Sequence, residues 1–309
     1  MLITFTVGNY RSIKDPVTLS MVCSRIKELP ANIIETKRKG LKLLKTAVIY
    51  GANASGKSNV LKAMEFMGNF IKTCLDDTLK NKEIPVDEFI FNTETVGKPS
   101  YFEIIFLIDE MIYRYGFEVD RKRIHSEWLF SNLKGKDRML FFRDENNIKV
   151  GNFFKEGKGL EDKTRDNALF LSVCAQFNGK VSLDILNWFM GSTVMMGMDD
   201  IAILQLTLEL LKYADYKNEI LKFISLADLQ IVDIKTNANL ILLINKILKD
   251  KDKNINDTLD KILKETTTTH FQYDKELNKI GNVDLNLFNE SEGTKKFLAF
   301  IFFLVSLTE

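Results

Sequence analysis

The sequence is poor in cysteine, and its cysteines match neither a disulfide framework nor a zinc site. Cys23, Cys74 and Cys174 lie far apart in the 309-residue chain, without a CxxC pair or a Cys/His ligand spacing. This scarcity excludes a small, disulfide-stapled secreted domain. It indicates a protein of the reducing cytoplasm.

The chain also lacks a long hydrophobic run, a signal peptide and an excess of one charge. Its longest apolar stretch, residues 297–307, is well short of the roughly 20 residues that a transmembrane helix needs. Residues 1–7 lack the basic start and apolar core of a signal peptide. Lys and Arg number 43 against 42 Asp and Glu, so no net field attracts nucleic acid or anionic lipid. We expect a soluble, cytoplasmic protein that makes no membrane contact.

What remains is typical of a globular protein with more than one subdomain. Apolar residues make up 45% of the sequence and charged residues 28%, which is the ordinary range for soluble proteins. A chain of 309 residues can bury a large core and divide into subdomains.

Apolar alternation predicts β-structure in the first half of the chain. Residues 3–7 and 17–21 alternate with a period of two on either side of Asp15-Pro16, which predicts an antiparallel hairpin. Residues 100–150 are β-rich, and their first two runs meet at Asp109-Glu110.

The second half has mainly helical spacing. Helices are predicted at residues 183–189, 201–213 and 218–226, and short strands at 231–234, 270–273 and 283–288. A Lys- and Asn-rich helical pair at 239–265 is expected to form a surface insertion. A very apolar helix follows Gly293.

The strongest motif is Gly51-Ala52-Asn53-Ala54-Ser55-Gly56-Lys57-Ser58, which satisfies the pattern G-x-x-x-x-G-K-S. The apolar run 46–50 predicts a strand that leads into it, and residues 60–71 keep helical spacing. Between strand and helix, the glycines let backbone N–H groups surround phosphate oxygens. Lys57 is expected to bridge the β- and γ-phosphates, Ser58 to ligate Mg²⁺, and Asn59 to extend this segment. The sequence therefore predicts a site for ATP and Mg²⁺.

A second motif, Glu290-Ser291-Glu292-Gly293-Thr294, opens the last hydrophobic helix. Free N–H groups at such a helix start can hold a γ-phosphate. A serine before a helix is, however, commonly an N-cap, so the motif alone leaves both interpretations open.

These motifs occur in a recognisable order. Asn9-Tyr10-Arg11-Ser12-Ile13 comes first, then the P-loop, and then the late Ser-x-Gly-Thr with its helix. This succession resembles the ABC-type ATPase heads of SMC-like and OLD-like proteins. In particular, it resembles the AAA-labelled ATP-binding proteins of bacterial phage-defence and abortive-infection systems.

The resemblance implies a fold, a site and a partner. The fold would be α/β, a P-loop NTPase head of ABC type with an antiparallel β subdomain and a helical subdomain. Arg11 would contact the nucleotide, while Ser291 and Gly293 would face ATP held by a second protomer, giving a homodimer joined through ATP. The expected domains are an ATPase lobe at 1–165, a helical subdomain at 166–265 and the start of a signature lobe at 266–309.

The same resemblance places a Walker B strand, with the catalytic glutamate, after the signature helix. The sequence stops at Glu309, so we expect slow turnover by this chain and a completing C-terminal segment or a nuclease-like effector subunit as partner. The catalytic residue is unassigned. DNA binding is left open, because the basic clusters 36–40 and 121–123 are short.

Two alternatives stay open at this point. Ile104 to Glu110 has the form of a Walker B strand, so an AAA+ or RecA-like ATPase could use Asp109 and Glu110. Residues 111–119 continue at once as β-rich sequence, however, which favours a hairpin turn at that place. The other alternative is a nucleotide-gated scaffold that does not hydrolyse ATP.

Overall fold

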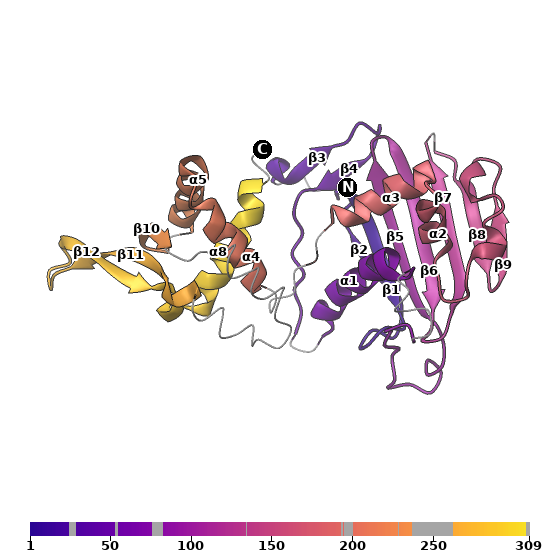
Figure 1. Cartoon of the computed structure of the whole chain (residues 1–309), viewed down its shortest axis with the longest axis horizontal. Coiled ribbons are helices and arrows are strands. Elements are labelled where there is room, and N and C mark those ends of the chain that lie inside the picture. The colour runs from indigo at the N-terminus through magenta and orange to yellow at the C-terminus, as the bar shows by residue number, and fades with distance from the viewer. Residues whose placement is uncertain are drawn as a thin grey trace. The chain divides into compact units, whose positions relative to one another are not determined.

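The computed structural model describes residues 1–24, 29–52, 55–75, 83–133, 135–192, 194, 200–227, 229–236 and 262–306. The chain forms two compact units, Met1–Val194 and Met195–Glu309 (Figure 1). Most of the predicted surface insertion at 239–265 lies outside the described residues. Within the described ranges, no helix has both the length and the apolar character that a bilayer crossing demands.

A seven-stranded antiparallel sheet is the frame of the first unit. Its strand order is β2-β1-β5-β6-β7-β8-β9, and all neighbours run antiparallel. The strands are β1 (Leu2–Gly8), β2 (Val17–Ser20), β5 (Ser100–Ile108), β6 (Met111–Val119), β7 (Ile124–Asn132), β8 (Arg138–Asp144) and β9 (Asn147–Val150). The predicted N-terminal hairpin and β-rich segment 100–150 are both confirmed.

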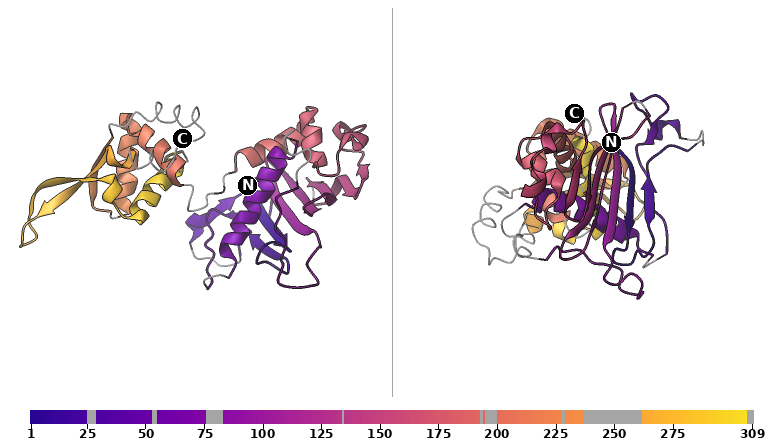
Figure 2. Two further views of the ribbon diagram at one scale, coloured as in Figure 1. Left: turned by 60° about the horizontal axis from the view of Figure 1, so that its bottom comes forward. Right: turned by 90° about the vertical axis from the view of Figure 1, so that its right-hand side faces the viewer.

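Helices cover one face of this sheet, as Figures 1 and 2 show. They are α1 (Lys57–Thr73), α2 (Phe170–Gln176) and α3 (Lys180–Met190), with 3₁₀ turns η3 (Lys155–Gly157) and η4 (Glu161–Lys163) nearby in sequence. Aromatic rings fill the space between α1 and the strands: Phe66 lies 5.0 Å from Phe102, and Phe70 lies 5.7 Å from Phe117. Alternate side chains of a strand share one face, so β5 and β6 present these rings to α1. The sheet thereby fixes the helix that carries the P-loop.

A buried carboxylate attaches α2 to the sheet. Glu127 of β7 is fully buried, and its oxygens accept hydrogen bonds from the backbone N–H groups of Phe170, at 2.7 Å, and Leu171, at 3.0 Å. Burial raises the pKa of Glu127, against the opposing effect of Arg143 and these N–H donors. Helices α2 and α3 therefore belong to the first unit, which ends at Val194, whereas the sequence suggested a boundary at 165.

A small hairpin covers part of the opposite face. It consists of β3 (Ile33–Glu35) and β4 (Lys42–Leu44), preceded by the 3₁₀ turn η1 (Pro30–Asn32). Leu43 packs with Ile3 and Leu107 in a separate small core. The Arg38 guanidinium in its turn donates to the backbone oxygen of Asn132 at 2.7 Å and to its side-chain oxygen at 2.6 Å. The central arginine of the basic cluster 36–40 thus fastens this hairpin to the sheet.

The second unit combines a small antiparallel sheet with helices. Its elements are β10 (Ile231–Thr236), β11 (Thr266–Tyr273), β12 (Lys279–Asn286), α4 (Asp200–Leu210), α5 (Ala214–Leu226), α8 (Glu292–Ser306) and the 3₁₀ turn η5 (Leu287–Asn289). Helix α8 packs against α4 and α5 and buries Leu298, Ile301 and Val305. These elements confirm the helices predicted at 201–213, at 218–226 and after Gly293, and the strands predicted at 231–234, 270–273 and 283–288.

Candidate nucleotide-binding site

The start of α1 has the backbone shape of a phosphate site. Gly56 precedes the helix with a φ of 90°, a left-handed conformation that only glycine adopts readily. Among the described residues, no side chain caps this helix. The positive dipole end of the helix is therefore not covered by a described capping side chain, and an anion can bind there.

Lys57 is folded back over the P-loop. Its ammonium donates hydrogen bonds to the backbone oxygens of Gly51 and Ala52, each at 2.7 Å. A Cβ on Gly51 would lie 2.8 Å from Ser55 Oγ and 3.7 Å from Lys57 Cδ, so glycine leaves room for both side chains here. Asn53 and Ala54 lie outside the described residues. The lysine thus stands where phosphate oxygens can replace carbonyl oxygens as its partners.

The segment before the P-loop is not a strand, and the prediction for residues 46–50 was wrong. The side chains of Val48, Ile49 and Tyr50 are exposed by 67%, 40% and 88%. A strand needs a neighbour to pair its backbone groups, and among the described residues no strand pairs with 46–50. Among the bonds of the described residues, only those of Thr46 anchor this segment: its backbone exchanges two hydrogen bonds with the Asn32 side chain, at 2.8 and 3.0 Å. Apolar run and β-propensity indicated a strand here, but they carry no information about a partner.

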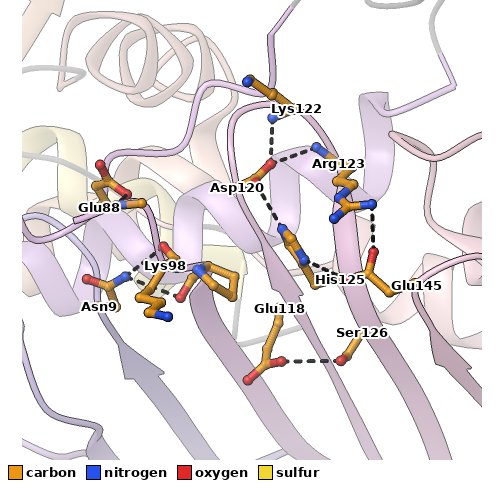
Figure 3. A network of polar contacts seen from close by, with 12 residues as sticks. Asn9, Glu88, Lys98, Glu118, Asp120, Lys122, Arg123, His125, Ser126 and Glu145 are labelled. Atoms are coloured by element: carbon orange, nitrogen blue, oxygen red, sulfur yellow. Dashed lines mark hydrogen bonds and ion pairs between the residues drawn. The ribbon is translucent and has the colours of Figure 1, made fainter. Parts of the chain in front are cut away.

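Asn9 organises the loop that faces the P-loop region. Its side-chain amide donates to backbone oxygens of Lys98 at 2.9 Å and Pro99 at 3.2 Å (Figure 3). Its side-chain oxygen accepts from the backbone N–H of Phe89 at 3.1 Å. Asn9 has a φ of 48°, which asparagine tolerates better than most residues. One buried side chain thereby fixes both ends of the segment 89–99.

The next residues of this motif connect the core to α1. Tyr10 is buried, with its ring 5.4 Å from Phe102 and 6.1 Å from Phe66. Ser12 Oγ accepts a hydrogen bond of 2.7 Å from the side-chain amide of Asn59, in the first turn of α1. A Cβ on Gly56 would lie 3.1 Å from the same Ser12 oxygen. The loop after β1 therefore touches the P-loop directly.

Arg11 lies in this contact region and has a strained backbone. Its φ is 51°, which is uncommon for a long side chain. The guanidinium forms an ion pair of 3.1 Å with Asp87 and lies 5.5 Å from the Tyr10 ring centroid. Its Nε is buried and finds no hydrogen-bond partner among the described residues. The arginine is thus held beside the P-loop helix with donor capacity to spare.

In the second unit, Ser291 is the N-cap of α8. Its hydroxyl accepts a hydrogen bond of 3.0 Å from the Thr294 N–H. The preceding residue, Glu290, accepts from His270 Nε2 at 2.7 Å and also from the Thr268 hydroxyl. Both partners lie on β11, so the sheet holds the loop that carries Ser291.

Gly293 has no local structural reason to be glycine. It stands in the first turn of α8, and among the described residues a Cβ there would meet only Ser291 Oγ, at an ordinary 3.6 Å. A glycine inside a helix costs about 0.5–1 kcal/mol relative to alanine. Such a glycine is typical of a place where a ligand or another backbone approaches closely.

Asp109 and Glu110 form a hairpin turn. Ile108 of β5 is paired with Met111 of β6, and Asp109 has a φ of 51°. β5 runs antiparallel to both of its neighbours. The hairpin interpretation is confirmed, and this pair does not end a parallel central strand as a Walker B motif would.

The two arginines of the second basic cluster are paired with carboxylates. Arg121 lies 3.4 Å from Asp87, and Arg123 lies 2.9 Å from Glu145. His125 stands between two acids: its Nε2 is 2.8 Å from Asp120 and its Nδ1 is 3.0 Å from Glu145 (Figure 3). Burial lowers the pKa of His125, but the hydrogen bonds to both carboxylates outweigh it and leave that pKa raised.

A scan against protein-family models matches residues 47–307 to the family described as "AAA domain, putative AbiEii toxin, Type IV TA system". The match runs from just before the P-loop through α8. The chain belongs to this family. A search of curated proteins gives no match. As an AAA-domain protein it is a P-loop NTPase with a mixed α/β fold, in a family that generally binds ATP with Mg²⁺.

The geometry fits those cofactors. An αL glycine, an uncapped helix start and an inward-turned lysine are the parts that hold a triphosphate. The described residues contain no group of three or more His, Cys, Asp or Glu side chains that could hold a metal by themselves. Mg²⁺ would instead be shared between the Ser58 hydroxyl and the phosphates, as this ion's preference for substrate oxygens suggests.

Proposed function

We propose that this protein is an ATP-binding head of ABC type that dimerises through nucleotide, acting as the sensor or motor subunit of a bacterial anti-phage defence system. The observation that carries ATP binding is Lys57, whose ammonium lies against the Gly51 and Ala52 carbonyls beside the start of α1. Phosphate oxygens of ATP take the place of these carbonyls. Ser58 then supplies a ligand to Mg²⁺.

Arg11 is the second nucleotide contact in the proposal. It lies one residue from Ser12, which is bonded to Asn59 in the first turn of α1. Its ion pair with Asp87 leaves Nε without a partner among the described residues. A guanidinium with spare donors suits a phosphate oxygen.

Dimerisation rests on the start of α8. Ser291 and Gly293 would face the γ-phosphate of ATP held by a second copy of the chain. Support comes from Gly293, because its place in the helix has room for a side chain and no positive φ. The close approach of a phosphate explains why residue 293 is a glycine, which the fold of the chain alone does not explain.

The defence role is supported by the family description, which names an AbiEii toxin and a type IV toxin–antitoxin system. In the proposal, the ATP-dependent dimer controls a nuclease-like effector or a completing C-terminal segment. DNA is a further candidate partner.

Calorimetry with ATP and Mg²⁺ tests the binding step. Wild type should bind ATP, and Lys57→Ala should lose measurable binding while keeping its melting temperature. Equal ATP affinities in the two proteins would contradict the proposal that Lys57 and the P-loop bind ATP.

Two further measurements test what binding does. Sedimentation velocity should show dimer with ATP and monomer without it, and the Lys57→Ala chain should stay monomeric. Phosphate release by wild type over that of Lys57→Ala distinguishes a hydrolysing head from a nucleotide-gated scaffold. Dimerisation without ATP, or none with it, would exclude ATP as the dimer contact.

A further inference from the structure

A hollow beside the P-loop helix has the chemistry of a nucleoside site. It has a volume of about 390 Å³ and is lined by two arginines, two carboxylates and two apolar side chains: Arg11, Arg121, Asp87, Glu88, Ile90 and Phe91. None of the described P-loop residues, Gly51, Ala52 and 55–58, lines it. It is therefore a candidate for the part of a nucleotide that the P-loop does not hold.

The apolar wall of this hollow is unusually exposed. Phe91 is 79% and Ile90 64% exposed. Phe89 packs against the Phe91 ring in a T-shaped arrangement, with 5.6 Å between ring centroids. Asn9 in turn fixes Phe89 through its backbone N–H. An aromatic ring that is held in place yet open to solvent is a platform on which a flat heterocycle can stack.

The hollow is connected to the N-terminal end of α1 through Ser12. Ser12 also lines it, and Ser12 is bonded to Asn59 in the first turn of the helix. Phosphates bind at a helix N-terminus, so a hollow near this end is within reach of the rest of the nucleotide. Another hollow, of about 400 Å³, is also lined by Arg11 but has its walls from Lys62 to Thr73 of α1. That hollow runs alongside the helix, away from its N-terminal end.

Two arginines share one carboxylate at the edge of the hollow. Asp87 pairs with Arg11 at 3.1 Å and with Arg121 at 3.4 Å, so two guanidiniums are gathered at one edge of the hollow. They suit a phosphate next to a ribose. One Glu88 oxygen accepts from the Gly97 N–H at 2.9 Å. The other oxygen is an acceptor for the amino group or the ribose hydroxyls of a nucleoside, which are donors.

We propose that Phe91 and Ile90 form the base platform for a purine nucleotide whose phosphates occupy the P-loop, with Arg11 between base and phosphates. The inference rests on the proposed function, because it presupposes that the P-loop binds ATP. It adds that the nucleoside contributes to affinity through one aromatic stack. The base should therefore matter to this protein, and not the triphosphate alone.

The test compares ATP with inorganic tripolyphosphate, each with Mg²⁺, by calorimetry on the full chain. The variants are Phe91→Ala and, as a matched control, Phe153→Ala. Phe153 is also an exposed phenylalanine of the first unit, 65% exposed, but it lies outside the hollow. Lys57→Ala serves as the control for phosphate binding, and melting temperatures show that each variant is folded.

We expect Phe91→Ala to weaken ATP about tenfold or more, the size of one lost base–aromatic stack. Its tripolyphosphate affinity should stay within about twofold of wild type, and Phe153→Ala should change neither. Lys57→Ala should lose both ligands.

Other outcomes overturn the inference in distinguishable ways. If Phe91→Ala binds ATP like wild type while Lys57→Ala does not, the base lies elsewhere and the proposed function stands. If Phe91→Ala only weakens association between copies, Phe91 is a protein contact. If wild type binds neither ATP nor tripolyphosphate, the proposed function fails together with the inference.

Discussion

Ser12 accepts a hydrogen bond of 2.7 Å from the side chain of Asn59, and this contact joins the loop after β1 to the first turn of the P-loop helix. Asn9, three residues earlier, fixes the segment 89–99 through its side chain. A short motif after the first strand thus positions two distant segments beside the same helix. The residues of this motif should differ in how much each contributes to the free energy of unfolding.

Asn9→Ala should be far more damaging than Ser12→Ala. Asn9 is buried and its amide satisfies several backbone groups, so its loss leaves them unpaired, at about 1–3 kcal/mol. Ser12→Ala removes one exposed hydrogen bond, worth about 1 kcal/mol or less. Urea denaturation measures the two free energies of unfolding. Equal losses would mean that Asn9 does not hold the loop.

Asp109→Ala combined with Glu110→Ala should leave ATP affinity and turnover unchanged, because both residues belong to a hairpin turn. The double variant should nevertheless be less stable, by about 1 kcal/mol, since alanine disfavours the positive φ of Asp109. Asp109→Gly, which accepts that φ, should be at least as stable as wild type. A hundredfold loss of Mg²⁺-dependent ATPase activity in the double variant would instead indicate that these two acids are catalytic.

The His125 cluster makes stability depend on pH. The folded pKa of His125 lies above its ordinary value of 6.5, so its contribution is fully present below about pH 6.5 and is lost as the pH rises through the folded pKa. Asp120, Glu145 and Arg123 are the charged groups that face it or its carboxylates. The difference in melting temperature between wild type and His125→Gln should shrink from pH 6 to pH 9. A constant difference over this range would show that His125 does not titrate in the fold.

Ser291 and Gly293 should separate stability from association. Ser291→Ala removes the N-cap of α8 and should cost about 1 kcal/mol. Gly293→Ala should stabilise the helix by about 0.5–1 kcal/mol, because the added Cβ has room. The same alanine should abolish ATP-dependent dimerisation if the γ-phosphate approaches there. Dimers of normal strength in Gly293→Ala would place the nucleotide contact elsewhere.

The sequence predicted those elements whose signals are local. The hairpin at the N-terminus, the helix after Lys57 and the turn at Asp109-Glu110 all follow from apolar period and turn residues next to one another. The contacts of Asn9 could not be predicted, because its partners lie far along the chain and share no pattern with it. For residues 46–50, the sequence showed the β-propensity of the segment but not whether another strand would pair with it. Long-range pairing is what a single sequence conceals.

The pairing of β1 with β5 sets an order on the folding of the site. Gly8 is opposite Tyr101, so the P-loop, Arg11 and Phe91 all belong to one long excursion of chain between two adjacent strands. Closing such a loop is entropically costly, and contacts of this sequence separation form slowly. During synthesis, the aromatic face of α1 cannot be covered until β5 has left the ribosome. The site therefore requires synthesis through at least β5, and a nascent chain halted before Ser100 should not yet possess it.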